Sequence, residues 1–180
     1  MTSWRIPKDN TALLIIDAQE KLLAAMPNPQ SIEKRIATAA HIANALQIPI
    51  HITEQCPQKL GPTLLSIKQA AAETAHYHTK TTFSALPALP RPIPKHILVC
   101  GLETHVCVRQ TIYDLRAHEY IPYLLADAIT SRHLIDHDTA LRELSTDRIL
   151  ITTLETITFE ILQSADHPQF KTIQTLIKQL

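Results

Sequence analysis

The sequence predicts an α/β fold in a single domain, residues 1–180, with a doubly wound parallel sheet and helices on both faces. Short apolar runs alternate with longer stretches whose apolar residues recur every three or four positions, as in parallel strands joined by crossover helices. The run Ala12–Ile16 is apolar throughout, which is typical of a strand covered on both faces. With 180 residues, the chain is long enough for one well-buried domain and too short for two. These observations indicate a Rossmann-like, three-layer α/β/α arrangement.

The first half of the chain is expected to supply three strands and two helices. After the first strand, Ser31 begins a helix whose apolar positions follow a period close to 3.6. A proline-rich connection precedes the second half and is expected to be a surface loop. The expected elements are a strand at 12–16, a helix from 31 to 46, a strand at 48–53, a loop at 54–62, a helix at 66–73 and an extended piece at 75–79.

The second half repeats the alternation more clearly and contains no internal repeat. Its last segment carries apolar residues on one helical face, so it is expected to dock as an amphipathic helix. The expected strands are 96–100, 121–126 and 149–152, and the expected helices are 104–118, 136–144, 154–163 and 169–178.

Composition excludes several functional classes. Lys plus Arg and Asp plus Glu each number 17, so the formal charge is zero, and no basic stretch could follow a phosphate backbone. We therefore expect neither a nucleic-acid partner nor a membrane partner. The first ten residues lack the apolar core of a signal peptide, and three cysteines make no disulfide framework. A cytoplasmic location is the simplest expectation.

Chemically capable residues follow the expected strands, where ligands of such sheets bind. Asp17 follows the first strand, Lys80 ends the extended piece and Gly101 closes the strand at 96–100. Cys107 lies in the first turns of the next helix, where unpaired N–H groups and the helix dipole favour a thiolate. A lone cysteine at such a position is more often a small buried apolar residue, so spacing alone leaves both interpretations open.

Three segments of the chain resemble the motifs of the isochorismatase-like cysteine hydrolases. They are 15–22 (IIDAQEKL), 79–85 (TKTTFSA) and 100–108 (CGLETHVCV), and they occur in the family's order. Four further segments resemble one branch of that family, the small isochorismatase domain-containing proteins: 53–55 (TEQ), 60–63 (LGPT), 126–132 (ADAITSR) and 167–171 (HPQFK). The resemblance extends from about residue 11 to the C-terminus.

The resemblance implies a catalytic triad of Asp17, Lys80 and Cys107. Asp17 would accept the thiol proton, Lys80 would steady the charges, and Cys107 would attack a carbonyl carbon to give an acyl-enzyme. The family pattern also implies an oxyanion hole made by the backbone N–H groups of Glu103 and Cys107, and a cis peptide bond at Leu102–Glu103. It further implies a homo-oligomer.

Four residues that flank the motifs at strand ends are candidates for the wall of a substrate pocket: Gln19, Glu54, Gln55 and Phe83. Each could equally be a hydrogen-bonding loop residue.

A catalytic metal is not expected, although His76 and His78 would point to the same side of a strand, a spacing that can bind metal. The nicotinamidase branch of the family carries its metal on an Asp-x-His motif after the second strand, and this chain has residues 53–55 (TEQ) there. We therefore expect no metal and no cofactor, and nicotinamide is a weak candidate substrate.

The remaining candidates have simpler interpretations. Cys100 is expected in the core, and Cys56 is at most an oxidation site in a loop. Two residues apart on a helix, His105 and the nucleophile diverge by about 200°, which favours a structural role for His105. Arg132 could bind an anionic group or pair with Asp127, and the sequence leaves both open.

The leading functional prediction is a cysteine-dependent hydrolase of a small molecule, acting on an amide-type C–N bond through a covalent Cys107 intermediate. The alternative is a weakly active or non-catalytic binding protein that retains the fold. A redox-sensing thiol protein ranks last, because the three cysteines lie in different segments.

Overall fold

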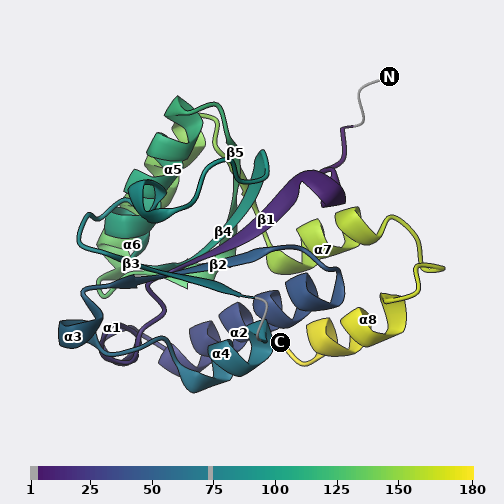
Figure 1. Cartoon of the computed structure of the whole chain (residues 1–180), viewed down its shortest axis with the longest axis horizontal. Helices are drawn as coiled ribbons and strands as arrows, with labels where there is room; N and C mark the ends of the chain where they lie inside the picture. The colour runs from purple at the N-terminus through teal and green to yellow at the C-terminus, as the bar shows by residue number, and fades with distance from the viewer. Residues whose placement is uncertain (1–3, 73–74) are drawn as a thin grey trace.

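The computed structural model describes residues 4–72 and 75–180, which form one six-stranded parallel sheet (Figure 1). The strand order is β3-β2-β1-β4-β5-β6, so the chain winds outwards from β1 to one edge and then from β4 to the other. This order confirms the doubly wound fold. The strands are β1 Thr11–Ile16, β2 Ile50–Gln55, β3 His76–Lys80, β4 His96–Leu102, β5 Ile121–Thr130 and β6 Leu150–Thr152.

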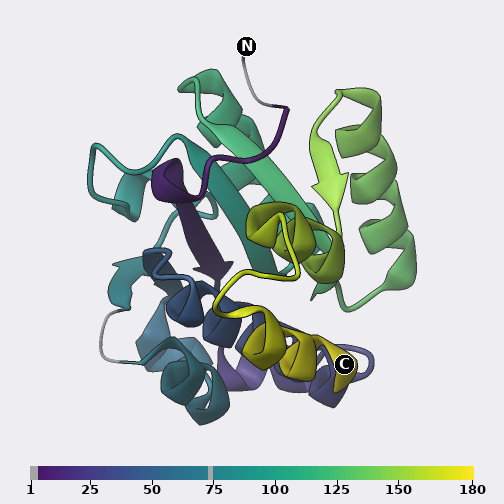
Figure 2. The same cartoon turned by 90° about the vertical axis from the view of Figure 1, so that its right-hand side faces the viewer.

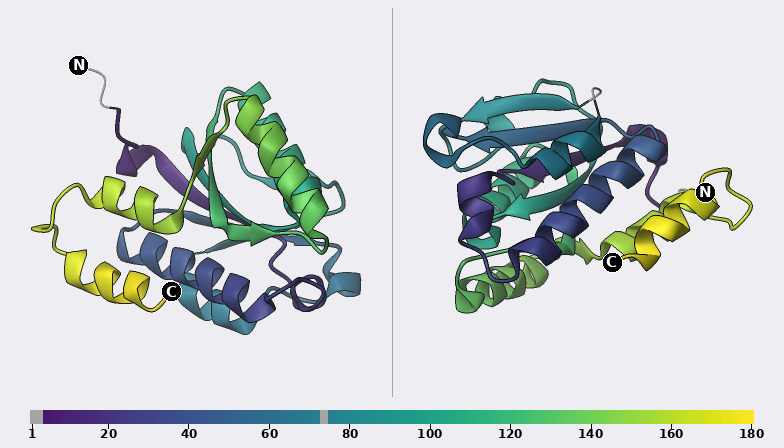
Figure 3. Two further views of the ribbon diagram at one scale, coloured as in Figure 1. Left: turned by 180° about the vertical axis from the view of Figure 1, so that it is seen from behind. Right: turned by 90° about the horizontal axis from the view of Figure 1, so that it is seen from below.

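Helices cover both faces of the sheet. Helices α2, α4, α7 and α8 contribute to one apolar core, and α5 and α6 contribute to the other. The C-terminal helix α8 lies beside α2 (Figures 2 and 3). The α-helices are α1 Glu20–Ala24, α2 Pro29–Ala45, α3 Pro57–Leu60, α4 Leu65–Ala71, α5 Arg109–Ala117, α6 Leu134–Thr146, α7 Leu154–Leu162 and α8 Phe170–Lys178. Shorter turns are the 3₁₀ segments η1 Lys8–Asn10 and η2 Leu86–Ala88, and the π-helical turn η3 Thr104–Val108.

The alternation of side chains along β1 explains why its sequence is apolar throughout. Leu13 and Ile15 pack into the core under α2, whereas Leu14 and Ile16 pack into the core under α5. All six residues of the strand are buried. Both faces of β1 therefore remove apolar surface from water, at about 25 cal/mol per Å².

Most expected boundaries lie within a few residues of the observed ones, and the main differences lie around the carboxyl ends of the strands. β2 extends to Gln55 because Glu54 and Gln55 pair with Thr79 and Lys80 of β3. The rest of the expected loop contains the single turn α3, and the short helix α1 was not expected. The expected helix at 66–73 corresponds to α4, and its last residue, Glu73, lies outside the described residues.

Gly101 allows β1 and β4 to approach closely near their carboxyl ends. Its φ is +117°, and a Cβ atom there would lie 2.0 Å from the carbonyl oxygen of Ile16. Only glycine fits this contact. Ile16 is also paired with Thr53 of β2, so the carboxyl ends of three central strands meet at one edge. Among the described ranges, no helix combines the length and apolar character that a membrane span requires.

Candidate active site

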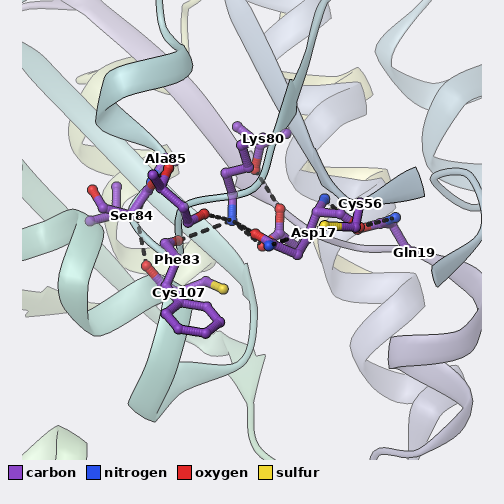
Figure 4. A network of polar contacts seen from close by, with 12 residues as sticks. Asp17, Gln19, Cys56, Lys80, Phe83, Ser84, Ala85 and Cys107 are labelled. Atoms are coloured by element: carbon purple, nitrogen blue, oxygen red, sulfur yellow. Dashed lines mark hydrogen bonds and ion pairs between the residues drawn. The ribbon is translucent and has the colours of Figure 1, made fainter. Parts of the chain in front are cut away.

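The three residues of the expected triad meet at the carboxyl edge of the sheet (Figure 4). Asp17 directly follows β1, Lys80 is the last residue of β3, and Cys107 lies in η3 after β4. The Lys80 ammonium donates to Asp17 Oδ2 at 2.6 Å, and both residues lie close enough to the Cys107 thiol to affect its pKa. All three are buried, and Cys107 is only 6% exposed. The fold thus collects an acid, an amine and a thiol from segments far apart in sequence.

The Lys80 ammonium is surrounded by four oxygen atoms. Besides Asp17, it donates to Gln55 Oε1 at 2.6 Å and to the carbonyl oxygens of Thr82 and Phe83 at 3.2 and 3.0 Å. Its side chain is 1% exposed. A buried ammonium needs such partners to offset the loss of hydration. Lys80 is therefore fixed in place and is not free to bind a second anion.

Asp17 is held by the strand next to it. Thr53 donates its hydroxyl to Asp17 Oδ1 at 2.8 Å, and the Thr53 carbonyl accepts from the Asp17 backbone N–H at 3.1 Å. The residue has a left-handed backbone with φ 51°, a conformation that aspartate tolerates better than most residues. Burial raises the pKa of Asp17 above its usual value, although the charge of Lys80 opposes the shift. A carboxylate with a raised pKa is a stronger proton acceptor than an exposed one.

The resting state of Cys107 differs from the sequence-based expectation. Burial, and then the negative charge of Asp17, raise the pKa of Cys107 to about 12 despite the opposing charge of Lys80. This direction of the shift runs against the expectation that the start of the helix favours a thiolate at Cys107. The physical reason is that the thiol is buried and lies near the Asp17 carboxylate, and the positive charge of Lys80 does not outweigh these two effects. Cys107 rests as a thiol beside an acceptor for its proton.

The turn before the nucleophile is tightly folded. The Leu102–Glu103 peptide bond is cis, and the Glu103 carbonyl accepts from the N–H groups of Val106 and Val108 at 3.1 and 3.2 Å. The latter bond closes the π-type turn that carries Cys107. The roles of the Glu103 and Cys107 N–H groups as oxyanion donors remain a prediction.

Two threonines that the sequence analysis missed support the triad. Thr53 binds Asp17, as described above. Thr111, on α5, accepts a hydrogen bond from the Ala85 N–H at 2.8 Å and donates to the Cys107 carbonyl at 2.6 Å. It therefore connects the loop after Lys80 to the nucleophile's turn. Thr111 lies four residues after Cys107, on the same helical face, which is the one signal that could have identified it.

Of the four expected pocket residues, three form hydrogen bonds within the protein and one is exposed. Gln19 is fully buried, donates to the Gln55 and Gly61 carbonyls and accepts from the Gln55 N–H. It therefore connects the end of β2 to the loop at Gly61. Glu54 accepts from the N–H and hydroxyl of Thr63. Gln55 holds Lys80, and the Phe83 side chain is 54% exposed. Contact of these four with a substrate remains a prediction.

A cavity of about 410 Å³ opens beside the triad, between the ends of β2 and β3 and the turn η2. Lys80 is the only charged residue that lines it, and Cys107 is not in its wall. The lining residues are Cys56, Pro57, Gln58, Thr79, Lys80, Thr81, Thr82, Pro87 and Ala88. This cavity is large enough for a small organic molecule.

Cys100 and Cys56 occupy different environments. Cys100 is fully buried in the core, and burial raises its pKa. Cys56 is partly exposed and lines the cavity, and its sulfur accepts from Gln55 Nε2 at 3.7 Å.

The histidines of β2 and β3 form a stack away from the triad. His51 lies between His76 and His78, with ring centroids 5.3 Å apart in both pairs, and burial lowers the pKa of His51 to about 4. Within residues 4–72 and 75–180, no group of three or more His, Cys, Asp or Glu side chains is arranged to hold a metal ion.

Arg132 does not pair with Asp127. Asp127 binds Arg35 at 2.8 Å and accepts from the Leu154 N–H, on the other face of the sheet. Arg132 instead contacts Glu103. Asp127 lies within β5, and its side chain meets Arg35 on one face of the sheet. Arg132 follows the end of the strand, so the two side chains are separated.

Comparison with known proteins agrees with this fold. A model of the isochorismatase domain matches residues 11–156. The chain belongs to the isochorismatase domain family. Isochorismatase domain-containing protein 2 from Bos taurus is 34% identical over 180 residues, which cover 97% of this chain and 86% of that protein.

Solved structures of similar proteins share the architecture. The structure described as MAR1 ribonuclease from Caenorhabditis elegans has 32% identity and a TM-score of 0.91, and the match covers 97% of this chain and 92% of that one. A pyrazinamidase/nicotinamidase from Streptococcus mutans has 20% identity and a TM-score of 0.65, covering 79% and 99% of the two chains. The latter similarity shows the fold alone. The chain thus has an isochorismatase-like hydrolase fold.

Proposed function

We propose that this family member hydrolyses an amide-type C–N bond of a small molecule, with Cys107 as the nucleophile. The observation that carries the proposal is the position of the buried Cys107 thiol at the same edge of the sheet as Asp17 and Lys80, whose side chains lie 2.6 Å apart and affect its pKa. A thiol, a proton acceptor and a fixed positive charge are the parts that covalent acyl transfer requires. Residues beside this triad also line a cavity of suitable size.

Acylation begins with transfer of the thiol proton. The Cys107 sulfur attacks the carbonyl carbon while its proton passes to Asp17, and the carbonyl π electrons move onto oxygen. The N–H groups of Glu103 and Cys107 would stabilise this oxyanion. When the carbonyl forms again, the C–N bond breaks, the leaving nitrogen takes the proton from Asp17, and a thioester remains on Cys107. Lys80 offsets the negative charge that passes between sulfur and carboxylate.

Deacylation uses the same groups in the reverse direction. Asp17 accepts a proton from water as the water oxygen attacks the thioester carbon. Collapse of the second tetrahedral intermediate breaks the C–S bond and releases a carboxylic acid. The Cys107 sulfur then recovers the proton from Asp17. These reaction steps use only the substrate, water and residues of the site.

The raised pKa of Cys107 fits a coupled proton transfer. Because the resting thiol is neutral, the nucleophile is generated only when Asp17 removes the proton during attack. The raised pKa of Asp17 brings the affinities of donor and acceptor for the proton closer together. This arrangement keeps the thiol unreactive until a substrate is bound.

A binding function without efficient turnover is the alternative, and one observation favours it. Cys107 is 6% exposed and does not line the cavity, so a ligand could occupy the cavity without reaching the sulfur.

Intact-protein mass spectrometry separates the two functions. The full chain is exposed to an anilide (4-nitroacetanilide), an ester (4-nitrophenyl acetate) and an imide (succinimide). We expect a mass gain of one acyl group that is retained in Cys56→Ala and lost in Cys107→Ala. Adducts that persist in Cys107→Ala, or no adduct with any compound, would contradict the covalent mechanism and favour the binding function.

RNA belongs in the same panel because the Caenorhabditis elegans relative is described as a ribonuclease. We expect no cleavage of RNA by this chain, since its formal charge is zero and a phosphate backbone needs a basic surface. Cleavage that depends on Cys107 would overturn the assignment to small molecules.

We also propose that the chain works as a homo-oligomer in the cytoplasm. Exposed apolar side chains such as Leu134 and Ile135, 67% and 71% exposed, are candidates for a subunit contact. The free thiols of Cys56, Cys100 and Cys107 are compatible with a reducing compartment. Light scattering of the purified chain measures the assembly, and a monomer would contradict this part of the proposal.

A further inference from the structure

We infer that Arg132 is a positioning residue for the oxyanion turn, acting through the buried carboxylate of Glu103. This inference rests on the proposed function, because it takes the Glu103 N–H as a donor to the tetrahedral oxyanion. Arg132 itself contacts neither Asp17, Lys80 nor Cys107 in the described hydrogen bonds and ion pairs. Its effect would be on the direction of the backbone that precedes the nucleophile.

The contact between Arg132 and Glu103 is a double one. Glu103 Oε2 accepts from the Arg132 backbone N–H at 3.0 Å and from its guanidinium Nε at 3.2 Å. The Glu103 side chain is 8% exposed, whereas the Arg132 side chain is 56% exposed. A buried carboxylate is therefore held by a residue that is itself accessible. Because the Glu103 carbonyl also accepts from Val106 and Val108, the residue is fixed at both its side chain and its backbone.

The next two residues of the turn are connected to the same segment. Thr104 Oγ1 lies 2.9 Å from His137 Nδ1, and His105 Nδ1 lies 2.9 Å from Ser131 Oγ. His105 Nε2 also lies 3.9 Å from Asp136 Oδ2. Three consecutive side chains of the nucleophile's turn thus each have a partner in residues 131–137, which we name the bracing segment.

The sheet explains why these segments meet. β4 and β5 are parallel neighbours, and Leu102 pairs with Thr130, so the chain leaves both strands at the same edge. The bracing segment then leads into α6, which packs against η3. Thr104 and Ser131 are buried at 0% and 1% exposure. A turn held at three consecutive residues by the bracing segment has little freedom to shift, as an oxyanion site requires.

Two other polar clusters are weaker candidates for a functional role. The cavity lined by Arg5, Lys8 and His167 is at the surface, and its Lys8 already pairs with Asp9. In the described residues, the contacts of the His51 stack are with other side chains and indicate no bound ligand. The bracing contacts are partly buried, involve three consecutive residues and lie next to the nucleophile.

Two reagents separate positioning from general damage to the site. Acylation of Cys107 by 4-nitrophenyl acetate passes through a tetrahedral oxyanion, whereas alkylation by iodoacetamide is a direct displacement that forms none. Both rates at Cys107 are measured by peptide mass spectrometry on the full chain, for wild type, Arg132→Ala, Arg132→Lys and Arg35→Ala. Arg35→Ala is the matched control, because it removes an arginine–carboxylate pair of β5 on the opposite face.

For Arg132→Ala we expect acylation to slow by about 10-fold to 100-fold, because small displacements of a catalytic group cost rates of this size. Alkylation should keep the wild-type rate, Arg132→Lys should recover part of the acylation rate, and Arg35→Ala should change neither. Equal loss of both rates, or loss of neither, would overturn the inference while leaving the proposed function intact. Absence of acylation at Cys107 in wild type would overturn the proposed function and the inference together.

Discussion

The two halves of the candidate site differ in how their polar groups are satisfied. The ion-pair half, Asp17 with Thr53, Gln55 and Lys80, buries two charges that are enclosed by hydrogen bonds. The nucleophile half, residues 102–108, carries no buried charge at its reactive atom, because Cys107 rests as a neutral thiol. Its fixed contacts belong to the residues around the sulfur. In the ion-pair half, the groups needed for reactivity also stabilise the fold. In the nucleophile half, reactivity depends on the positions of the groups around the sulfur.

The difference teaches that equally important catalytic residues need not be equally important to the fold. Removing one member of a buried ion pair leaves an uncompensated charge, whereas removing a thiol leaves only a small void. Substitutions in the ion-pair half should lower stability and activity together. Substitutions in the nucleophile half should separate the two.

The largest loss of stability is expected where the halves join. In Gly101→Ala the added Cβ would lie 2.0 Å from the Ile16 carbonyl oxygen, with φ at +117°, so β1 and β4 must separate. We expect the free energy of unfolding, measured in urea by circular dichroism, to fall by more than about 4 kcal/mol. Gly61→Ala is the control, since its nearest contact is the flexible Glu20 side chain at 3.3 Å. Equal losses in both variants would contradict this account of the junction.

Breaking the buried ion pair is expected to cost somewhat less. Lys80→Met leaves the Asp17 carboxyl buried without its cation, and we expect a loss of about 3–5 kcal/mol, again by urea unfolding. The same variant should abolish acyl transfer. Arg35→Ala breaks a more accessible pair, so about 1 kcal/mol or less is expected there. A Lys80→Met protein as stable as wild type would remove the distinction between the halves.

Replacing the nucleophile should separate activity from stability. Cys107→Ala removes a buried sulfur without creating an unpaired charge, so a change of about 1 kcal/mol in unfolding free energy is expected. Acylation by 4-nitrophenyl acetate at this position should be lost completely. If instead this variant were as unstable as Lys80→Met, the thiol would have a structural role that the contacts do not reveal.

The smallest effect is a change in the pH dependence of labelling, and it is measured at a temperature where the Asp17→Asn protein, which lacks the buried ion pair, remains folded. Burial raises the pKa of Cys107, so without a proton acceptor its alkylation depends on a scarce thiolate. In Asp17→Asn we expect the rate of iodoacetamide labelling at Cys107 to rise about tenfold per pH unit between about pH 6 and 8. In wild type the rise should be shallower, since ionised Asp17 accepts the proton. The same slope in both proteins would contradict the role of Asp17 as base.

Much of the fold follows from local patterns along the chain. The apolar run of β1 and the 3.6 period of α2 are both present in the sequence, and the structure has these elements within a few residues of the expected bounds. The extension of β2 to Gln55 could not be read in this way. Polar residues there belong to the strand because β3 pairs with them, and pairing is not a local property.

The candidate site divides in the same way. Asp17, Lys80 and Cys107 could be named from motifs at expected strand ends, and the structure brings them together. Thr53 and Thr111 could not, because their roles depend on which strand or loop lies beside them.

The sequence by itself determined the order of strands and helices and the positions of the acid, the amine and the thiol along them, because period and residue type are local properties. Only the tertiary structure decided the direction of the pKa shift at Cys107 and the partner of Arg132. Burial and distance between remote segments set both, since the energy of a charge depends on everything that surrounds it in space.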